Sequence, residues 1–273
     1  MPVVSLKPTI IEAGRLCTAE EIEKDLVAHH KTPASIYGRI KTACKNNNAA
    51  ELKELFDEWL AGDYKIEELS FAMDAAVRND NVAIVSTFIS HGIGCYTSYS
   101  FTAVQHKAKG VLLEFLKDNW DINEPFAEGW PPALGYADQD EDMVSWLLEH
   151  GADPNQQSLI DITPLSVAVR DAAPSTIKLL LDHPGTDRGL SVNKKLYEDH
   201  PLSYNQYFWM GCGTPLHDAA NVGKLHVVRY LLEHGADPTI RDAKDRTPLD
   251  WAVKHEHFEV VTELRAAMES RES

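Results

Sequence analysis

The sequence predicts an all-α solenoid of about seven short helical hairpins that stack in series. The first observation is a repeated turn and helix start, because Thr214-Pro215-Leu216 recurs 33 residues later as Thr247-Pro248-Leu249. The second is Gly-Ala-Asp-Pro, which occurs at 151–154 and again at 235–238. The third is the i, i+1, i+4, i+5 spacing of four apolar residues, which forms one stripe of a helix: Val227, Val228, Leu231 and Leu232. A helix this short cannot bury its apolar face alone, so copies on either side must complete the core.

Weaker copies of the hairpin extend toward the N-terminus. Residues 71–92 and 98–121 keep most of the apolar core positions. Residues 35–66 keep only the two-helix pattern, which predicts a degenerate N-terminal cap, since end repeats need a polar outer face. We therefore expect the repeat array proper over 67–268, followed by a short tail at 269–273.

Residues 1–34 are expected to be an N-terminal segment with a capping helix. Residues 1–17 are apolar, contain two prolines and are expected to be irregular. Thr18 and Glu21 form a capping-box pattern, which predicts a helix over 19–30. We expect this helix to seal the first repeat, and a detachable partner-binding helix is the alternative.

Taken together, T-P-L-H at 214–217, G-A-D-P at a fixed offset and the 33-residue period resemble the ankyrin-repeat family. The resemblance covers roughly 35–268. It implies that each repeat has a β-turn finger, an inner helix and an outer helix, and that protein partners usually meet the fingers and inner helices on a concave side. It also implies that His217 hydrogen-bonds the adjoining turn. Gly235 is expected to end an outer helix in a left-handed conformation.

One repeat is longer than the others, because Thr163 and Thr214 lie 51 residues apart rather than 33. The extra residues fall within 187–212, in the finger region. They are rich in aromatic side chains, which offer large contact area at a small cost in conformational entropy. Two interpretations stay open, because the loop could form a binding surface or fold back into its own groove. Its candidate contact residues are Tyr204, Tyr207, Phe208, Trp209 and Met210.

The remaining candidate partner-binding residues occupy positions that the resemblance leaves exposed. On the inner helices these are Arg78, His106, Asp138, Arg170, Asp171, Asn221 and Lys254. At the fingers they are Phe126, Leu159, Ile160 and Trp130, the last of which replaces the turn threonine. Leu159 and Ile160 are unusually apolar for solvent-exposed tips. Packing against a neighbouring loop is their alternative role.

Charge and cysteine usage restrict the class of partner. A net charge of −16 disfavours nucleic acid, whose binding needs clustered Lys and Arg. The four cysteines lie far apart in the sequence, which favours a reducing compartment and a cytoplasmic or nuclear location. No run of 18 apolar residues is present, so we expect no membrane partner.

No motif predicts catalytic chemistry, a metal site or a cofactor. His255 and His257 are two residues apart and do not share a helix face, so they do not form a zinc-binding pair. The sequence holds no P-loop, no glycine-rich dinucleotide turn and no nucleophile elbow. The chain is therefore not expected to be an enzyme on these motifs.

Three functions follow from the sequence, in order of preference. The first is a protein-binding adaptor that uses the concave face, the finger tips and the 187–212 loop. The second is a small-molecule-binding protein or enzyme with a pocket in the concave groove. Its candidate residues are Trp130, Asp138, Arg170, Asp171, Tyr207 and Trp209. The third is an oligomeric scaffold subunit, such as a homodimer joined through the loop.

Overall fold

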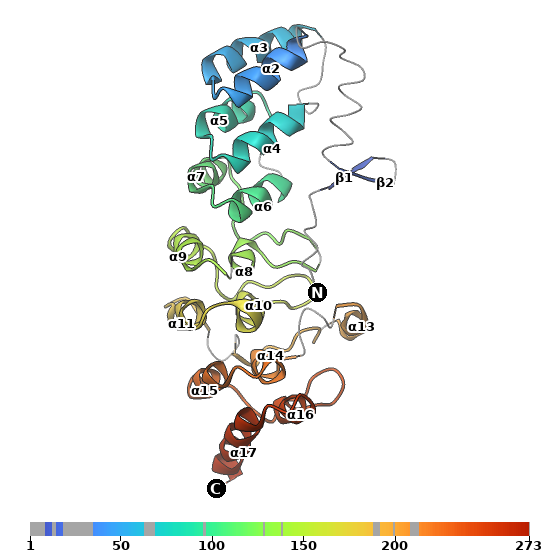
Figure 1. Ribbon diagram of the computed structural model, residues 1–273, viewed down its shortest axis with the longest axis vertical. Coiled ribbons are helices and arrows are strands. Elements are labelled where there is room, and N and C mark those ends of the chain that lie inside the picture. Colours follow the sequence, from blue (N-terminus) through green and yellow to red (C-terminus); the bar gives the residue numbers. More distant parts are fainter. Residues whose placement is uncertain are drawn as a thin grey trace. The chain divides into compact units, whose positions relative to one another are not determined.

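The structure is a computed structural model, shown in Figure 1. It describes residues 9–12, 15–18, 35–62, 69–94, 97–127, 129–137, 139–187, 192–198, 200–207 and 213–272. The chain divides into two compact units, an N-terminal unit of Met1–Trp120 and a C-terminal unit of Asp121–Ser273. The two units are described separately below.

Three stacked helical hairpins make up the helical part of the N-terminal unit. Their helices are α2 (Ile36–Lys45) with α3 (Ala49–Ala61), α4 (Ser70–Arg78) with α5 (Val82–Ser90), and α6 (Thr97–Gln105) with α7 (Lys109–Lys117). The inner helices α2, α4 and α6 contact one another in series, and so do the outer helices α3, α5 and α7. Trp59 and Met73 are fully buried, and the rings of Phe56 and Phe88 meet edge to face at 4.6 Å. Each hairpin thus completes the core of its neighbour.

The N-terminal segment corrects one prediction. Residues 1–17 were expected to be irregular, but β1 (Thr9–Glu12) and β2 (Arg15–Thr18) pair as an antiparallel hairpin, with Thr9 opposite Thr18. Thr9, Ile10 and Ile11 of β1 are β-branched, which favours such pairing. Thr18, the expected helix cap, ends β2. The helix expected over 19–30 lies outside the described residues.

The C-terminal unit contains four further hairpins. Their helices are α8 (Ala133–Tyr136) with α9 (Glu141–Glu149), α10 (Pro164–Asp171) with α11 (Pro174–Asp182), α14 (Pro215–Val222) with α15 (Leu225–Glu233), and α16 (Pro248–Lys254) with α17 (Phe258–Glu272). A short 3-10 helix η2 (Pro201–Ser203) and α13 (Tyr204–Tyr207) lie between the fifth and sixth hairpins. The predicted all-α repeat fold of about seven units is confirmed, with the β1–β2 hairpin as an addition in the described part of the chain.

The inner helices begin where the sequence predicts. Thr163, Thr214 and Thr247 are N-caps of capping boxes, each followed by a proline at the first helical position. In the fourth repeat Trp130 stands at the equivalent sequence position, but the inner helix begins later, with Pro132 as its N-cap. Its helix α8 has no side-chain cap and is only 4 residues long. The loss of the hydroxyl acceptor therefore coincides with the shortest inner helix of the described repeats.

Backbone turns of one type recur through both units. The outer helices of the fourth and sixth repeats end before Gly151 and Gly235, whose φ angles are +95° and +92°. The predicted left-handed C-cap at Gly235 is confirmed. Its successor Ala236 donates to the carbonyl oxygen of Leu231 at 2.9 Å, which closes the helix end. The finger of a repeat is the loop before its inner helix. The fingers are 151–163 in the fifth repeat, 183–214 in the sixth and 235–247 in the seventh.

Candidate interaction surface

His217 joins the sixth repeat to the seventh finger. Its ring is fully buried, its Nδ1 accepts from the backbone N–H of Thr214 at 3.0 Å, and its Nε2 lies 3.0 Å from the carbonyl oxygen of Arg246. Burial lowers the pKa of His217 from 6.5 to about 4, so the ring is neutral at physiological pH. Its role is structural, as the sequence resemblance implied.

Asp242 organises the seventh finger. Its side chain is fully buried and accepts hydrogen bonds from the backbone N–H groups of Lys244 and Arg246 at 2.8 and 3.0 Å. It also accepts from Trp251 Nε1 at 3.0 Å and pairs with the Arg246 guanidinium at 2.9 Å. Burial alone would raise the pKa of Asp242, but these hydrogen bonds lower it below its ordinary value. The charged carboxylate thereby ties the finger to helix α16.

The described part of the long insertion folds back onto the fifth finger. A buried cluster is formed by Ile160, Ile162, Leu196, Tyr197 and Tyr204, with Val167 packed against it. The rings of Tyr197 and Tyr204 meet edge to face at 5.7 Å. Lys194 Nζ also lies 3.3 Å from Asp161 Oδ1 of the same finger. For Leu196, Tyr197 and Tyr204 of the insertion, self-packing is therefore the correct interpretation.

Two predicted contact residues are corrected by this cluster. Ile160 was expected at an exposed tip but is only 1% exposed, and Tyr204 is 5% exposed. Apolar surface gains free energy by leaving water, so the insertion and the finger bury each other rather than face a partner. Leu159, the neighbour of Ile160, stays 63% exposed.

The same insertion also reaches the seventh finger. The hydroxyl of Tyr204 hydrogen-bonds the guanidinium of Arg246. Lys244 Nζ donates to Asn205 Oδ1 at 3.0 Å and lies 5.3 Å from the centre of the Tyr204 ring. The insertion therefore bridges the fifth and seventh fingers within the C-terminal unit.

Asparagines form clamps between successive repeats of this unit. The side chain of Asn155 accepts from the Asp187 N–H at 2.8 Å and donates to the Gly185 carbonyl oxygen at 2.7 Å. Asn193 makes the same pair of bonds to Asp237 and Gly235, at 2.8 and 3.1 Å. Asn123 does so with Asp153 and Gly151, at 2.8 and 3.3 Å. These residues were not predicted, although Asn recurs at 123, 155 and 193, near the start of three successive fingers.

The two residues predicted at exposed inner-helix positions of the N-terminal unit lie close together. Arg78 on α4 lies 3.2 Å from His106 Nε2, just after α6, and its guanidinium pairs with Asp74 at 2.7 Å. Arg78 and His106 are both exposed. They form a polar link between neighbouring inner helices that stays accessible to solvent.

In the C-terminal unit the predicted residues fall into several groups. Phe126 and Trp130 are half-buried against Tyr136, with ring centres 5.7 and 5.3 Å away. Asp171 and Lys254 are exposed, and Arg170 and Asn221 are half-buried. The residues Asp138, Phe208, Trp209 and Met210 lie outside the described part, as does the side chain of Tyr207.

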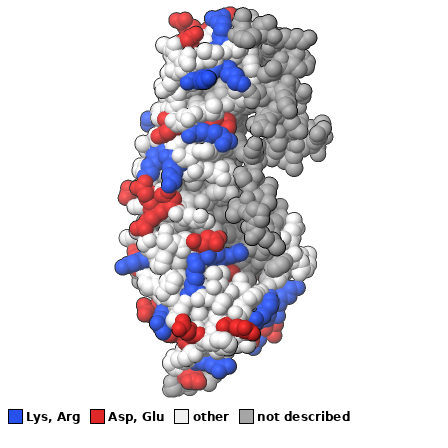
Figure 2. All heavy atoms as spheres, viewed as in Figure 1, with Lys and Arg blue, Asp and Glu red and all other residues white. Residues whose placement is uncertain are grey.

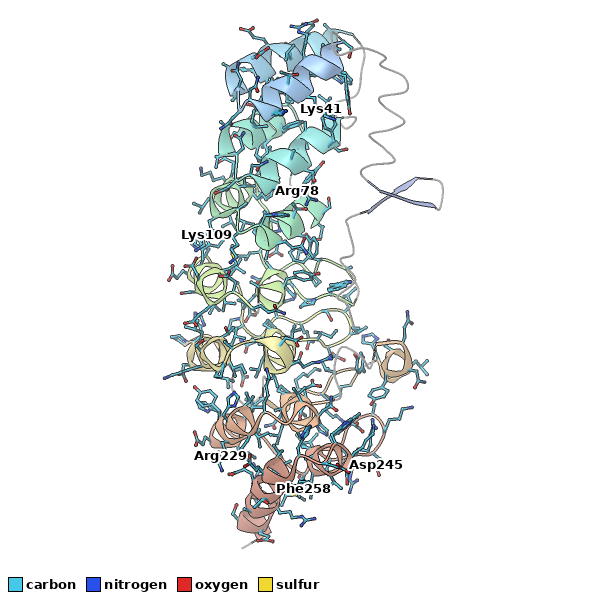
Figure 3. All side chains as sticks on the ribbon, in the orientation of Figure 1. Lys41, Arg78, Lys109, Arg229, Asp245 and Phe258 are labelled. Atoms are coloured by element: carbon cyan, nitrogen blue, oxygen red, sulfur yellow. The ribbon has the colours of Figure 1, made fainter. Side chains whose placement is uncertain are left out.

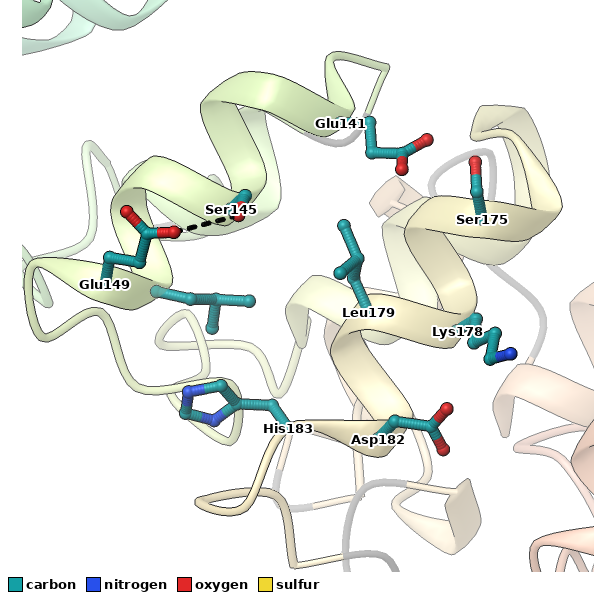
Figure 4. A pocket seen from close by; sticks show the side chains of 9 residues that line it. Glu141, Ser145, Glu149, Ser175, Lys178, Leu179, Asp182 and His183 are labelled. Atoms are coloured by element: carbon teal, nitrogen blue, oxygen red, sulfur yellow. Dashed lines mark hydrogen bonds between the residues drawn. The ribbon is translucent and has the colours of Figure 1, made fainter.

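Two pockets in the described part lie on outer helices rather than on fingers. The larger, of about 450 Å³, lies between α9 and α11 and is drawn in Figure 4. Its rim carries Glu141, Asp182 and Lys178, and Glu149 is held by a 3.3 Å hydrogen bond from Ser145. The second lies along α15. Neither is lined by any residue of the predicted concave-groove pocket.

Stacked hairpins with capped inner helices, glycine-ended outer helices and long fingers define a helical repeat protein. Sequence comparison specifies the class. Residues 133–159 match the family described as ankyrin repeat, and residues 189–270 match ankyrin repeats in three copies. The chain therefore contains ankyrin repeats over these residues. Such repeats are protein-interaction modules, and no described helix has the length and apolar character needed to cross a membrane.

Several curated proteins are similar over part of their length. The chain is 33% identical over 109 residues to NF-kappa-B inhibitor delta of Homo sapiens, which covers 40% of this chain and 32% of that protein. It is 30% identical over 139 residues to ankyrin repeat domain-containing protein OPG023 of Monkeypox virus, covering 44% and 19% respectively. It is 28% identical over 152 residues to ankyrin repeat protein nuc-2 of Neurospora crassa, covering 48% and 14%. Each match thus spans a third or less of the relative.

Proposed function

We propose that the chain is a non-catalytic adaptor that holds a protein partner on the finger side of its C-terminal unit. The observation that carries this proposal is the anchored insertion. It packs on the fifth finger and bonds the seventh finger, while Leu202 of the insertion is 89% exposed and Leu159 of the fifth finger is 63% exposed. Each leucine is close in sequence to a member of the buried cluster, Leu159 to Ile160 and Leu202 to Tyr204, and the cluster gives both a packed support. A rigid apolar contact loses little conformational entropy on binding.

Polar and aromatic groups extend this apolar centre in the same unit. We infer that the exposed Asp171 and Lys254 contact the partner, and that four half-buried residues contribute less: Phe126, Trp130, Arg170 and Asn221. In the N-terminal unit, Arg78 and His106 are the corresponding candidates. A polar rim around an apolar centre is the usual composition of a protein interface. We expect the adaptor to act in the cytoplasm or nucleus, since its cysteines suit a reducing compartment.

The test needs a defined partner. Proximity labelling in cells that express the chain identifies candidates, and calorimetry with purified components gives the dissociation constant. The pair Leu159→Asp and Leu202→Asp should weaken binding at least about tenfold, because burying a carboxylate in an apolar contact is costly.

The matched control uses leucines of the outer helices. Leu60 and Leu113 are 43% and 40% exposed, and both lie in the N-terminal unit. The pair Leu60→Asp and Leu113→Asp should leave the dissociation constant within about twofold. If the Leu159 and Leu202 variant binds the partner as tightly as the wild type and the control variant do, the finger side is not the binding surface. Circular dichroism of each variant confirms that the helices remain folded.

A further inference from the structure

Two ammonium groups of the seventh repeat lie on neutral partners. Lys244 Nζ donates to the amide oxygen of Asn205 and lies over the Tyr204 ring. Lys254 Nζ lies 4.6 Å from the centre of the Trp251 ring. Both lysines are exposed, and neither forms an ion pair with a described carboxylate at the usual distance. The positive charge of both groups is therefore available to a ligand.

A continuous series of contacts holds these two lysines in place. Lys244 lies on Tyr204, whose hydroxyl bonds Arg246. Arg246 lies 4.0 Å from the centre of the Trp251 ring, and Lys254 contacts the same ring. Trp251 is itself fixed by its hydrogen bond to Asp242. Cation–π contacts of this kind position a cation without neutralising its charge.

The three carboxylates within 241–254 already contact other groups. Asp242 pairs with Arg246, and Asp245 lies 3.5 Å from Arg241. Asp250 accepts from the backbone N–H of Thr247 at 2.7 Å as part of the capping box. Figure 2 shows Lys and Arg side chains over the loop that leads into α16, and Figure 3 labels Asp245 on that loop.

Resting on the proposed function, we propose that the partner segment seated on the seventh repeat is acidic, and that its Asp or Glu side chains pair with Lys244 and Lys254. Residues 241–254 hold four Lys and Arg (Arg241, Lys244, Arg246, Lys254) against three Asp (Asp242, Asp245, Asp250), and this balance contrasts with the net charge of −16 of the whole chain. An acidic peptide is repelled by the chain as a whole, so its binding must come from a local site. Complementary charge of this kind sets the specificity and association rate of an interface.

A defined probe tests the inference before the partner is known. The probe is a short fluorescein-labelled peptide of alternating Glu and Ser, and its reference is the same peptide with Gln for Glu. Fluorescence anisotropy with the full chain should show binding of the Glu peptide at low salt. The affinity should fall about tenfold or more when salt rises from about 50 mM to about 200 mM, because screening shortens the reach of the charges. If the Gln peptide bound as tightly as the Glu peptide, the inference would be wrong. It would also be wrong if the chain bound a single-stranded DNA oligomer but not the Glu peptide.

Variants then assign the site. Lys244→Gln with Lys254→Gln should weaken binding of the Glu peptide about tenfold, and Lys244→Arg with Lys254→Arg should keep it because the charge remains. The control pair is Lys41→Gln with Lys117→Gln, since Lys41 also lies over an aromatic ring, that of Phe71 at 5.9 Å. This pair removes the same charge from the N-terminal unit and should leave binding unchanged. An equal loss with both pairs would show a non-specific charge effect and refute the site.

The same variants separate this inference from the proposed function. If the identified partner loses affinity with the Leu159 and Leu202 pair but not with the Lys244 and Lys254 pair, the acidic contact is wrong and the finger-side adaptor stands. If neither pair changes binding, both proposals fail. If both pairs weaken binding, and the lysine pair also flattens its salt dependence, both proposals are supported.

Discussion

His217 Nε2 lies 3.0 Å from the carbonyl oxygen of Arg246, 29 residues further along the chain. Through this one imidazole, the first turn of α14 holds the finger of the following repeat. The bond requires a donor at Nε2 and an acceptor at Nδ1, which only the neutral ring provides. Because the ring is buried, a proton added to Nδ1 would break the capping box and place a charge in the core.

The first prediction concerns pH. Burial lowers the pKa of His217 to about 4 in the folded state, against 6.5 for an unperturbed imidazole. Between these values the unfolded chain binds more protons, so the free energy of unfolding should fall by about 1.4 kcal/mol per pH unit on acidification. This contribution is complete above about pH 6.5. Urea unfolding of the wild type and of His217→Asn across that range measures it. His217→Asn should show a smaller slope of unfolding free energy against pH than the wild type. The control His226→Asn, at an exposed histidine, should keep the wild-type slope.

The second prediction concerns the asparagine clamps. Asn193→Ala removes two hydrogen bonds to the backbone of Gly235 and Asp237 and leaves both backbone groups to find water. We expect a loss of about 1–3 kcal/mol in the free energy of unfolding. Asn205→Ala, which removes only an exposed bond to Lys244, should change it by less than about 0.5 kcal/mol. A clamp variant as stable as this control would contradict the role assigned to Asn193.

The third prediction concerns packing between outer helices. Leu231 on α15 is fully buried, so Leu231→Ala should cost about 2–5 kcal/mol through lost burial and the cavity left behind. Leu113→Ala, at a leucine that is 40% exposed, should cost far less. Thermal unfolding followed by circular dichroism compares the two. Equal melting temperatures would mean that the stacking register is wrong.

The fourth prediction concerns the anchor of the insertion. Tyr197 is 1% exposed and has a φ angle of +64°, which a non-glycine residue adopts only when its surroundings enforce it. Tyr197→Ala should release the segment, so that trypsin cleaves after Lys194 and Lys195 several-fold faster under native conditions. Leu202→Ala, in the same segment but 89% exposed, should keep the wild-type rate. Mass spectrometry of the early fragments identifies the cleavage sites.

The repeats were predictable because they obey one local rule many times. The helix period, the Thr-Pro helix starts and the glycines at helix ends each recur. A weak pattern in one repeat can therefore be recognised by comparison with the other repeats. The left-handed Gly235 and the structural role of His217 followed from this periodicity and from the family resemblance. Arg78 and His106 were likewise placed at equivalent exposed positions, and the structure brings them within 3.2 Å.

The insertion and the N-terminal strands were not predictable in the same way. Neither has a second copy in the chain against which its pattern could be compared. An aromatic residue such as Tyr204 suits an interface and a core equally well, because both bury apolar area. Only the three-dimensional position of Ile160 decides between them. Strands β1 and β2 depend on pairing with each other, which a helix-period analysis does not detect.

The position of the Asn193 clamp has a consequence for how the array accommodates extra sequence. The clamp lies near the start of the 187–212 insertion and holds the seventh finger, and Thr214 restarts the helix after the insertion ends. Helices α10 and α14, on either side of the insertion, remain in contact. The chain can therefore carry an added segment between two repeats while the flanking inner helices stay packed on each other.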